Sequence, residues 1–171
     1  MGTKRVGLAR VQALIENLKR DLNVSDTKLT GLETKVVLLT DTAATTLTKA
    51  AHAGRTMIIP NVGQDSTFTL PTPEVGMHLH FVGFGALAAD GHDVIFRATD
   101  DTVFFHGALV HHDTDQTGQT SAVVWGNGSD NDQIKLDLPE AFDIHLVGKS
   151  ATVWYVYGWT ASATPVTIAD A

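Results

Sequence analysis

The chain has 171 residues, 43% of them hydrophobic, which is enough for one globular core with an appendage and too short for two full-sized domains. It contains no cysteine, which excludes disulfides, thiolate nucleophiles and thiolate metal sites. Residues 1–40 carry seven of the 12 Lys and Arg residues against four acids (net +3), and the remainder carries five against 15 (net −10). This acidic remainder argues against nucleic-acid binding.

The first segment, VGLARVQALIENLKRDL at residues 6–22, predicts an amphipathic helix. Charged residues interrupt its apolar positions, so we expect neither a signal peptide nor a membrane span. With Leu8 at heptad position a, nine of the ten a and d positions are aliphatic, a pattern typical of a coiled coil. These ten positions are Leu8, Val11, Ile15, Leu18, Leu22, Ser25, Leu29, Leu32, Val36 and Leu39.

Two interpretations of this arm, residues 1–40, stay open. One is a self-associating coiled coil. The other is a pair of shorter helices, 4–22 and 26–39, docked on a partner or folded back, because Asn23 to Asp26 resemble a helix stop and Gly31 costs roughly 1 kcal/mol inside a helix. Either way, we assign attachment and oligomerisation to the arm. The candidate residues are Leu8, Val11, Leu14, Ile15, Leu18 and Leu22.

After Thr40 the hydrophobic period changes to two, which predicts strands. A Thr- and Ala-rich neck at 41–52 leads to a head at 53–171. We predict a mainly β protein whose head is an antiparallel β-sandwich or jelly-roll-like fold. The predicted strands are 47–50, 55–59, 67–70, 77–84, 93–98, 102–107, 121–125, 133–138, 143–148 and 152–159.

The last of these strands is apolar on both faces and therefore needs cover on two sides. We expect one of those sides to be a neighbouring subunit. With Gly158 treated as an interruption of the alternation, one face holds three large apolar side chains. We assign the subunit interface to these three, Trp154, Val156 and Trp159.

Two histidine-containing segments are candidates for chemistry. His78 and His80 share one face of a strand, but no third ligand follows at a diagnostic spacing. In 106–118 we expect His111, His112, Asp113 and Asp115 to form a solvated loop. The acidic loop 126–133 is better explained as a turn than as a calcium site. With no motif for phosphate binding or hydrolysis, we predict no catalytic residue, metal or cofactor, and no enzyme.

Three segments carry a resemblance to a known family: VGLARVQALIENLKRDL (6–22), STFTLPTPEVGMHLHFVG (66–83) and IHLVGKSATVWYVYGW (144–159). In the order arm, neck and β-head, the chain resembles small virion accessory proteins of marine tailed bacteriophages, in particular capsid decoration or head-fibre proteins of podovirus type. The resemblance implies a homotrimer, made in the host cytoplasm, that binds the major capsid protein and displays its head on the capsid surface. It implies no membrane partner. Tail-fibre heads have a similar layout, so the alternative is a receptor-binding head for a host surface glycan or protein.

Overall fold

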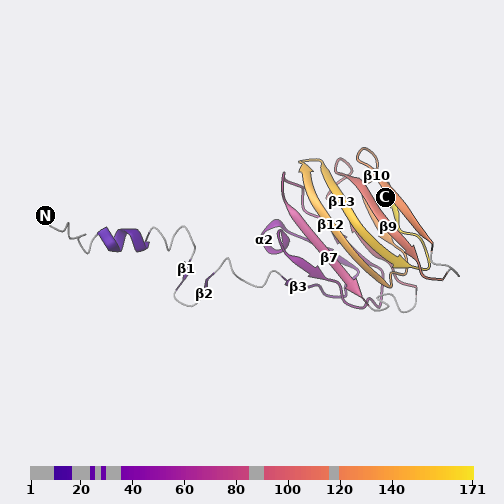
Figure 1. The fold of residues 1–171 in the computed structure, drawn as a ribbon, viewed down its shortest axis with the longest axis horizontal. Helices are drawn as coiled ribbons and strands as arrows, with labels where there is room; N and C mark the ends of the chain where they lie inside the picture. The colour runs from indigo at the N-terminus through magenta and orange to yellow at the C-terminus, as the bar shows by residue number, and fades with distance from the viewer. Residues whose placement is uncertain (1–9, 17–23, 26–27, 30–35, 85–90, 116–119) are drawn as a thin grey trace. The chain divides into compact units, whose positions relative to one another are not determined.

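The computed structural model describes residues 10–16, 24–25, 28–29, 36–84, 91–115 and 120–171 (Figure 1). The chain divides into two compact units, Met1–Lys35 and Val36–Ala171. Among the residues described, no helix is long and apolar enough to cross a membrane.

In the first unit, residues 10–16 are helical, and β1 (Val24–Ser25) pairs antiparallel with β2 (Lys28–Leu29). A helix over 26–39, whether separate or as the end of one long rod, is therefore wrong. Its final residues form β3 (Val36–Leu38), which belongs to the second unit. The adjacent valines of β3 favour a strand because β-branched side chains fit a pleated sheet better than a helix.

The predicted neck also lies within the second unit. Ala44–Thr46 forms β4, and the predicted strand at 47–50 is wrong because Lys49–His52 forms the short helix α2. The Thr48 side chain accepts a hydrogen bond from the backbone N–H of Ala51 at 3.4 Å and so caps the helix N-terminus. Residues 36–52 are thus part of the folded head and not a connector.

The second unit contains a seven-stranded sheet in the order β10-β9-β13-β12-β7-β5-β3 and a five-stranded sheet in the order β14-β11-β8-β6-β4. The further strands of the larger sheet are β5 (Thr56–Ile58), β7 (His78–Phe84), β9 (Phe104–Asp113), β10 (Ser121–Asn127), β12 (Ala141–Ser150) and β13 (Val153–Ser162). Those of the smaller sheet are β6 (Ser66–Thr69), β8 (Val94–Arg97), β11 (Gln133–Leu136) and β14 (Thr167–Ala169).

The protein is mainly β, as predicted, but the sheets are mixed and not antiparallel. From β3 to β8 the chain alternates between the two sheets, and β3, β5 and β7 pair in parallel, as do β4, β6 and β8. The prediction of antiparallel sheets is therefore wrong. Its reason is topological: a chain that winds repeatedly in one sense brings successive strands of each sheet into the same direction.

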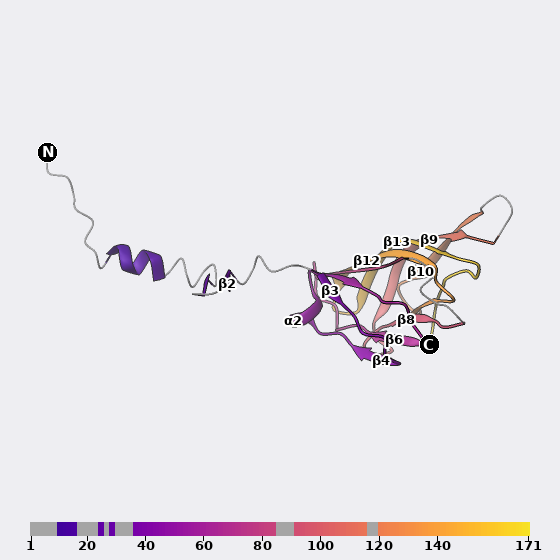
Figure 2. The same cartoon turned by 90° about the horizontal axis from the view of Figure 1, so that it is seen from below.

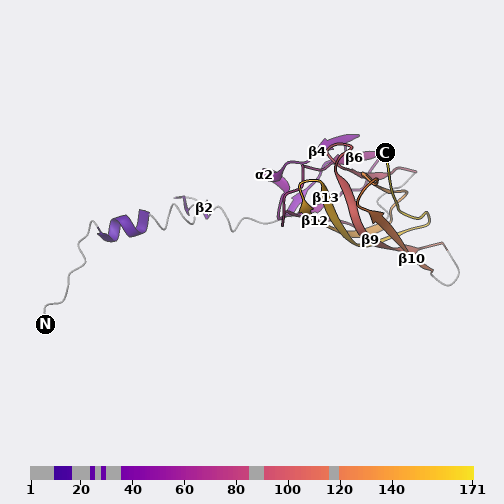
Figure 3. The same cartoon turned by 90° about the horizontal axis from the view of Figure 1, so that it is seen from above.

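Apolar side chains from both sheets meet in one core, with the smaller sheet on one side of the larger (Figures 2 and 3). The ring of Phe81 on β7 lies 4.5 Å from that of Phe96 on β8, between centroids, and both are fully buried. Phe142 on β12 meets Phe96 edge to face at 6.1 Å. Aromatic pairs of this kind add to the stabilisation from burial alone. The larger sheet therefore has an inner face in the core and an outer face turned away from it.

Candidate functional site

The alternation along β13 assigns the outer face. Trp154 and Val156 are fully buried in the core of the single chain, whereas Tyr155 and Tyr157 are 45% and 42% exposed. The assignment of Trp154 and Val156 to a subunit interface is therefore wrong, because their own chain already covers them. Trp159 lies in phase with the two tyrosines, on the outer face, since its partner on β12 is the outward residue Asp143.

Gly158 explains why the alternation continues through this point. It takes an inward position with φ +144°, and a Cβ there would lie 2.1 Å from the carbonyl oxygen of Asp143. The glycine is required by the close approach of β12 and does not interrupt the strand. The placement of Trp159 on the same strand face as Trp154 and Val156 is wrong because it treated this glycine as a change of phase. The assignment of Trp159 to a subunit interface stays a prediction.

His111 is a second correction. It lies in β9, is 2% exposed, and its Nδ1 is 3.2 Å from the Thr160 hydroxyl, so it is not part of a solvated loop. Among the residues that the structure describes, its Nε2 has no hydrogen-bond partner. Burial lowers the pKa of His111, against the opposing effect of Asp113. This histidine is a buried core residue that the folded protein favours in its neutral form.

The loop after β10 is a turn, as predicted. The Asn127 side-chain oxygen accepts hydrogen bonds from the backbone N–H groups of Ser129 at 2.8 Å and Asp130 at 3.0 Å. Asparagine commonly stabilises turns in this way. These two contacts account for the polar composition of the loop.

On the outer face, cross-strand neighbours form rows that run from β3 to β10. The row that crosses the centre of the face, here called the histidine row, contains imidazole, phenol and indole side chains. It consists of Val36, Thr56, His80, His145, Tyr157, Ala108 and Trp125. The next row along the strands consists of Leu38, Ile58, Val82, Asp143, Trp159, Val110 and Val123.

The centre of the outer face holds three polar side chains in contact. His80 Nε2 lies 2.8 Å from Asp143 Oδ1, and His145 Nε2 lies 3.0 Å from the same oxygen. His80 comes from β7, and the other two come from β12. Their side chains are 20 to 32% exposed, so the group is half-buried but open to solvent. Among the described residues, their ligand-type atoms all lie within 4.8 Å of one another.

Further contacts fix the orientation of both imidazoles. His80 Nδ1 lies 3.0 Å from the Thr56 hydroxyl, and His145 Nδ1 lies 3.2 Å from His78 Nε2. The His145 ring stacks between two others, with centroids 4.0 Å from His80 and 4.9 Å from Tyr157. Each ring nitrogen that faces away from Asp143 therefore has a partner able to donate or accept a proton.

Two of these histidines have lowered pKa values. Burial lowers the pKa of His78, and the neighbouring His145 and His80 add to the effect. Burial also lowers the pKa of His145, with repulsion from His80, while Asp143 opposes the shift. His78 and His145 consequently favour the neutral form, in which a ring nitrogen has a lone pair available to a ligand.

The sequence singled out His78 and His80, but not the residues that complete the cluster. Asp143 and His145 lie more than 60 positions downstream and face His80 only through the register of β12 on β7. No sequence spacing encodes that register. The sequence does contain a local signal, because polar and apolar residues alternate over 143–147. This alternation places Asp143 and His145 on one face of a strand.

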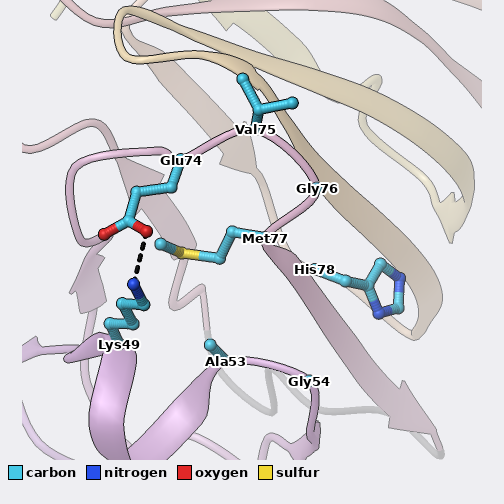
Figure 4. Close-up of a pocket in the computed structure, with 8 residues that line it drawn as sticks. All are labelled: Lys49, Ala53, Gly54, Glu74, Val75, Gly76, Met77 and His78. Carbon is cyan, nitrogen blue, oxygen red and sulfur yellow. Dashed lines mark hydrogen bonds and ion pairs between the residues drawn. The ribbon is translucent and has the colours of Figure 1, made fainter.

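A shallow pocket lies beside the cluster, near the start of β7 (Figure 4). Lys49 and Glu74 form an ion pair at one end, and the ring of His78 lies at the other. Both charged side chains are more than half exposed, so solvent screens their attraction. The pocket is lined by Lys49, Ala53, Gly54, Glu74, Val75, Gly76, Met77 and His78.

The predicted attachment residues are described only in part. Val11, Leu14 and Ile15 lie in the helical segment 10–16 and are 40%, 62% and 47% exposed. Leu8, Leu18 and Leu22 lie outside the described residues.

With the geometry in place, the chain was compared with known proteins. No protein-family model, no curated protein and no solved structure gives a significant match.

Proposed function

We propose that the protein is a non-enzymatic structural protein of a phage particle that decorates the outer surface of the capsid. Its arm binds the major capsid protein, and its β-head is displayed outward. The observation that carries the proposal is the division of the chain. Val36–Ala171 has a core of its own, whereas helix 10–16 exposes Val11, Leu14 and Ile15.

The energetics of these three side chains favour a partner. Burying a Val, Leu or Ile side chain contributes about 1.5 to 3 kcal/mol, which is lost while the side chain faces water. An assembled shell offers many equivalent surfaces, so several weak arms on one oligomer bind by avidity. The arm therefore acts as an attachment device that works when the partner is itself a repeated array.

The charge distribution supports the same orientation. Residues 1–40 have a net charge of +3 and residues 41–171 a net charge of −10. A basic arm is attracted to acidic patches on a shell, and an acidic head on the outside keeps particles apart.

Homotrimerisation is part of the proposal. The number of subunits, three, comes from the resemblance. The structural support for self-association is the outer face of the larger sheet. That face exposes large apolar side chains at the two ends of the histidine row and along one side of it. They include Val36, Leu38, Ile58, Phe84, Val110, Val123 and Trp125, with Trp125 70% and Leu38 76% exposed. Contiguous exposed apolar groups are typical of protein interfaces.

The finer architecture is also proposed here. The contact between Phe81 and Phe96 across the two sheets supports a β-sandwich. The parallel winding from β3 to β8 differs from the Greek-key connections of a jelly roll. We therefore propose a β-sandwich in which the strands from β3 to β8 alternate between the two sheets and pair in parallel within each.

The alternative function is a fibre head that binds a host surface glycan or protein. The observation that favours it is the exposure of Tyr155, Tyr157 and Trp125 on the outer face of the larger sheet. Exposed aromatic rings can stack on the apolar faces of sugar rings.

Copy number tests the proposal against this alternative. In purified particles of the virus that encodes the chain, we expect quantitative mass spectrometry to find it at tens to hundreds of copies, on the shell. A few copies, located on the tail, would favour the fibre head. Absence from the particles would contradict both.

A further inference from the structure

We propose that His80, Asp143 and His145 form a binding site for one divalent metal ion of the zinc type on the outer face of the larger sheet. The inference rests on the cluster alone and is independent of the proposed attachment to a capsid.

The backbone places the three side chains on a rigid support. His80 and His145 are directly opposite each other on β7 and β12, and Asp143 is the next residue of β12 on the same face. Both strands lie in the interior of the larger sheet. On the reverse face, Leu79, Phe81, Ile144 and Leu146 are fully buried in the core. A site built on packed strands holds its ligands more accurately than one built on loops.

The ligand atoms converge on one place. Both imidazole Nε2 atoms approach Asp143 Oδ1, at 2.8 and 3.0 Å. In a tetrahedral zinc site with bonds of about 2.0–2.1 Å, ligand atoms lie roughly 3.3–3.4 Å apart. Both separations from Asp143 Oδ1 are shorter than this, and the His80 and His145 rings stack with their planes 10° apart. Binding an ion therefore requires both imidazoles to turn until their Nε2 lone pairs point at one position.

The surrounding contacts supply the protonation state that binding requires. A metal-bound Nε2 must carry no proton, so Nδ1 of the same ring must carry it. The Nδ1–H group of His80 can then donate a hydrogen bond to the Thr56 hydroxyl. The Nδ1–H group of His145 can likewise donate a hydrogen bond to His78 Nε2. Metal-ligating histidines usually donate their second N–H in this manner. Both rings can therefore change tautomer without losing a hydrogen-bond partner.

The donor set selects the class of ion. Two imidazoles and one carboxylate suit zinc and neighbouring transition metals, whereas calcium and magnesium favour all-oxygen sites. Three protein ligands leave one position of a tetrahedral ion open, and the partial exposure of the cluster allows water to fill it.

Titration of the full-length protein with Zn²⁺ tests the site. We expect isothermal titration calorimetry to show one ion per chain and the melting temperature to rise with Zn²⁺, because the ion binds the folded state. Mg²⁺ at the same concentration should not raise it. If Zn²⁺ does not bind, or if Mg²⁺ raises the melting temperature equally, the proposal is wrong.

Substitutions locate the ion. His80→Gln and Asp143→Asn should each weaken Zn²⁺ binding by more than about tenfold, and Thr56→Val, which removes a hydrogen bond behind a ligand, by about tenfold. His112→Gln is the matched control, since His112 is an exposed histidine of the same face that pairs with Ser121. Equal affinity in His80→Gln and the control would overturn the site.

A direct spectroscopic measurement does not depend on the variants. Co²⁺ added to the unsubstituted protein should give the strong visible absorption of a four-coordinate ion and saturate at one equivalent per chain. A titration with no saturable visible band would contradict the proposal.

Discussion

The two units of the chain differ in how far their apolar side chains are exposed. Every residue of helix 10–16 is exposed, including Leu14 at 62%, whereas in the head Trp154 and Phe81 are fully buried. The head therefore has its own source of stability. The described helix of the arm leaves Val11, Leu14 and Ile15 exposed, so these side chains gain the free energy of burial only when a further surface covers them. This difference fits the proposal that one unit of the chain folds and the other attaches.

The largest expected effect concerns stability. Trp154→Ala should lower the free energy of unfolding by about 3–5 kcal/mol, because it leaves a cavity under β13. Leu14→Ala, in the arm, should change it by less than about 0.5 kcal/mol. Urea denaturation followed by the fluorescence of Trp125 and Trp159 measures both. Similar losses for the two variants would show that arm and head are not separable.

A backbone substitution sharpens the same contrast within the head. Gly158→Ala should destabilise the protein by more than about 1 kcal/mol, since its φ of +144° is unfavourable for alanine and the Cβ would meet the Asp143 carbonyl. The matched control is Gly63→Ala, whose Cβ would make an ordinary 3.4 Å contact with Asp41. Thermal unfolding of both variants decides; an unchanged melting temperature for Gly158→Ala would contradict the close approach of β12 and β13.

A smaller effect depends on pH. Burial lowers the pKa of His111 below its ordinary value of 6.5, so the unfolded chain takes up this proton first as the pH falls. The contribution to stability is complete above pH 6.5 and is lost as the pH falls through the lower, folded pKa. Between about pH 7 and 5, His111→Gln should therefore lose less stability than the unsubstituted protein.

Denaturation midpoints measured across this pH range provide the test. An unchanged pH dependence in His111→Gln would mean that this histidine does not titrate between the folded and unfolded states.

The sequence predicted most strands of the head because their alternation of apolar and polar residues is a local property. It did not predict which strands pair. The parallel winding of β3 to β8 depends on contacts between residues far apart in the chain, and hydrophobic periodicity does not record strand direction. At α2 the prediction missed a local signal, because the Thr48 side chain caps the N-terminus of the helix.

The candidate site shows a similar division. His78 and His80 could be placed on one face from their spacing, but the cluster with Asp143 and His145 depends on the register of β7 against β12. The segment at His111 appeared polar, and the burial of that residue depends on its place in β9, beside Thr160. Local pattern therefore predicted single faces, and tertiary register determined which side chains meet.

We propose that the arm attaches the protein and that the head is displayed, and particle binding tests this division most directly. Full-length protein carrying Leu14→Asp and Ile15→Asp should fold as the unsubstituted protein does, yet fail to occupy purified particles that lack the protein. Val75→Asp, which changes an 82% exposed valine of the head, should bind at full occupancy. Sedimentation of labelled protein with the particles measures occupancy. Full occupancy by the arm variant would place the attachment surface on the β-head and contradict the account.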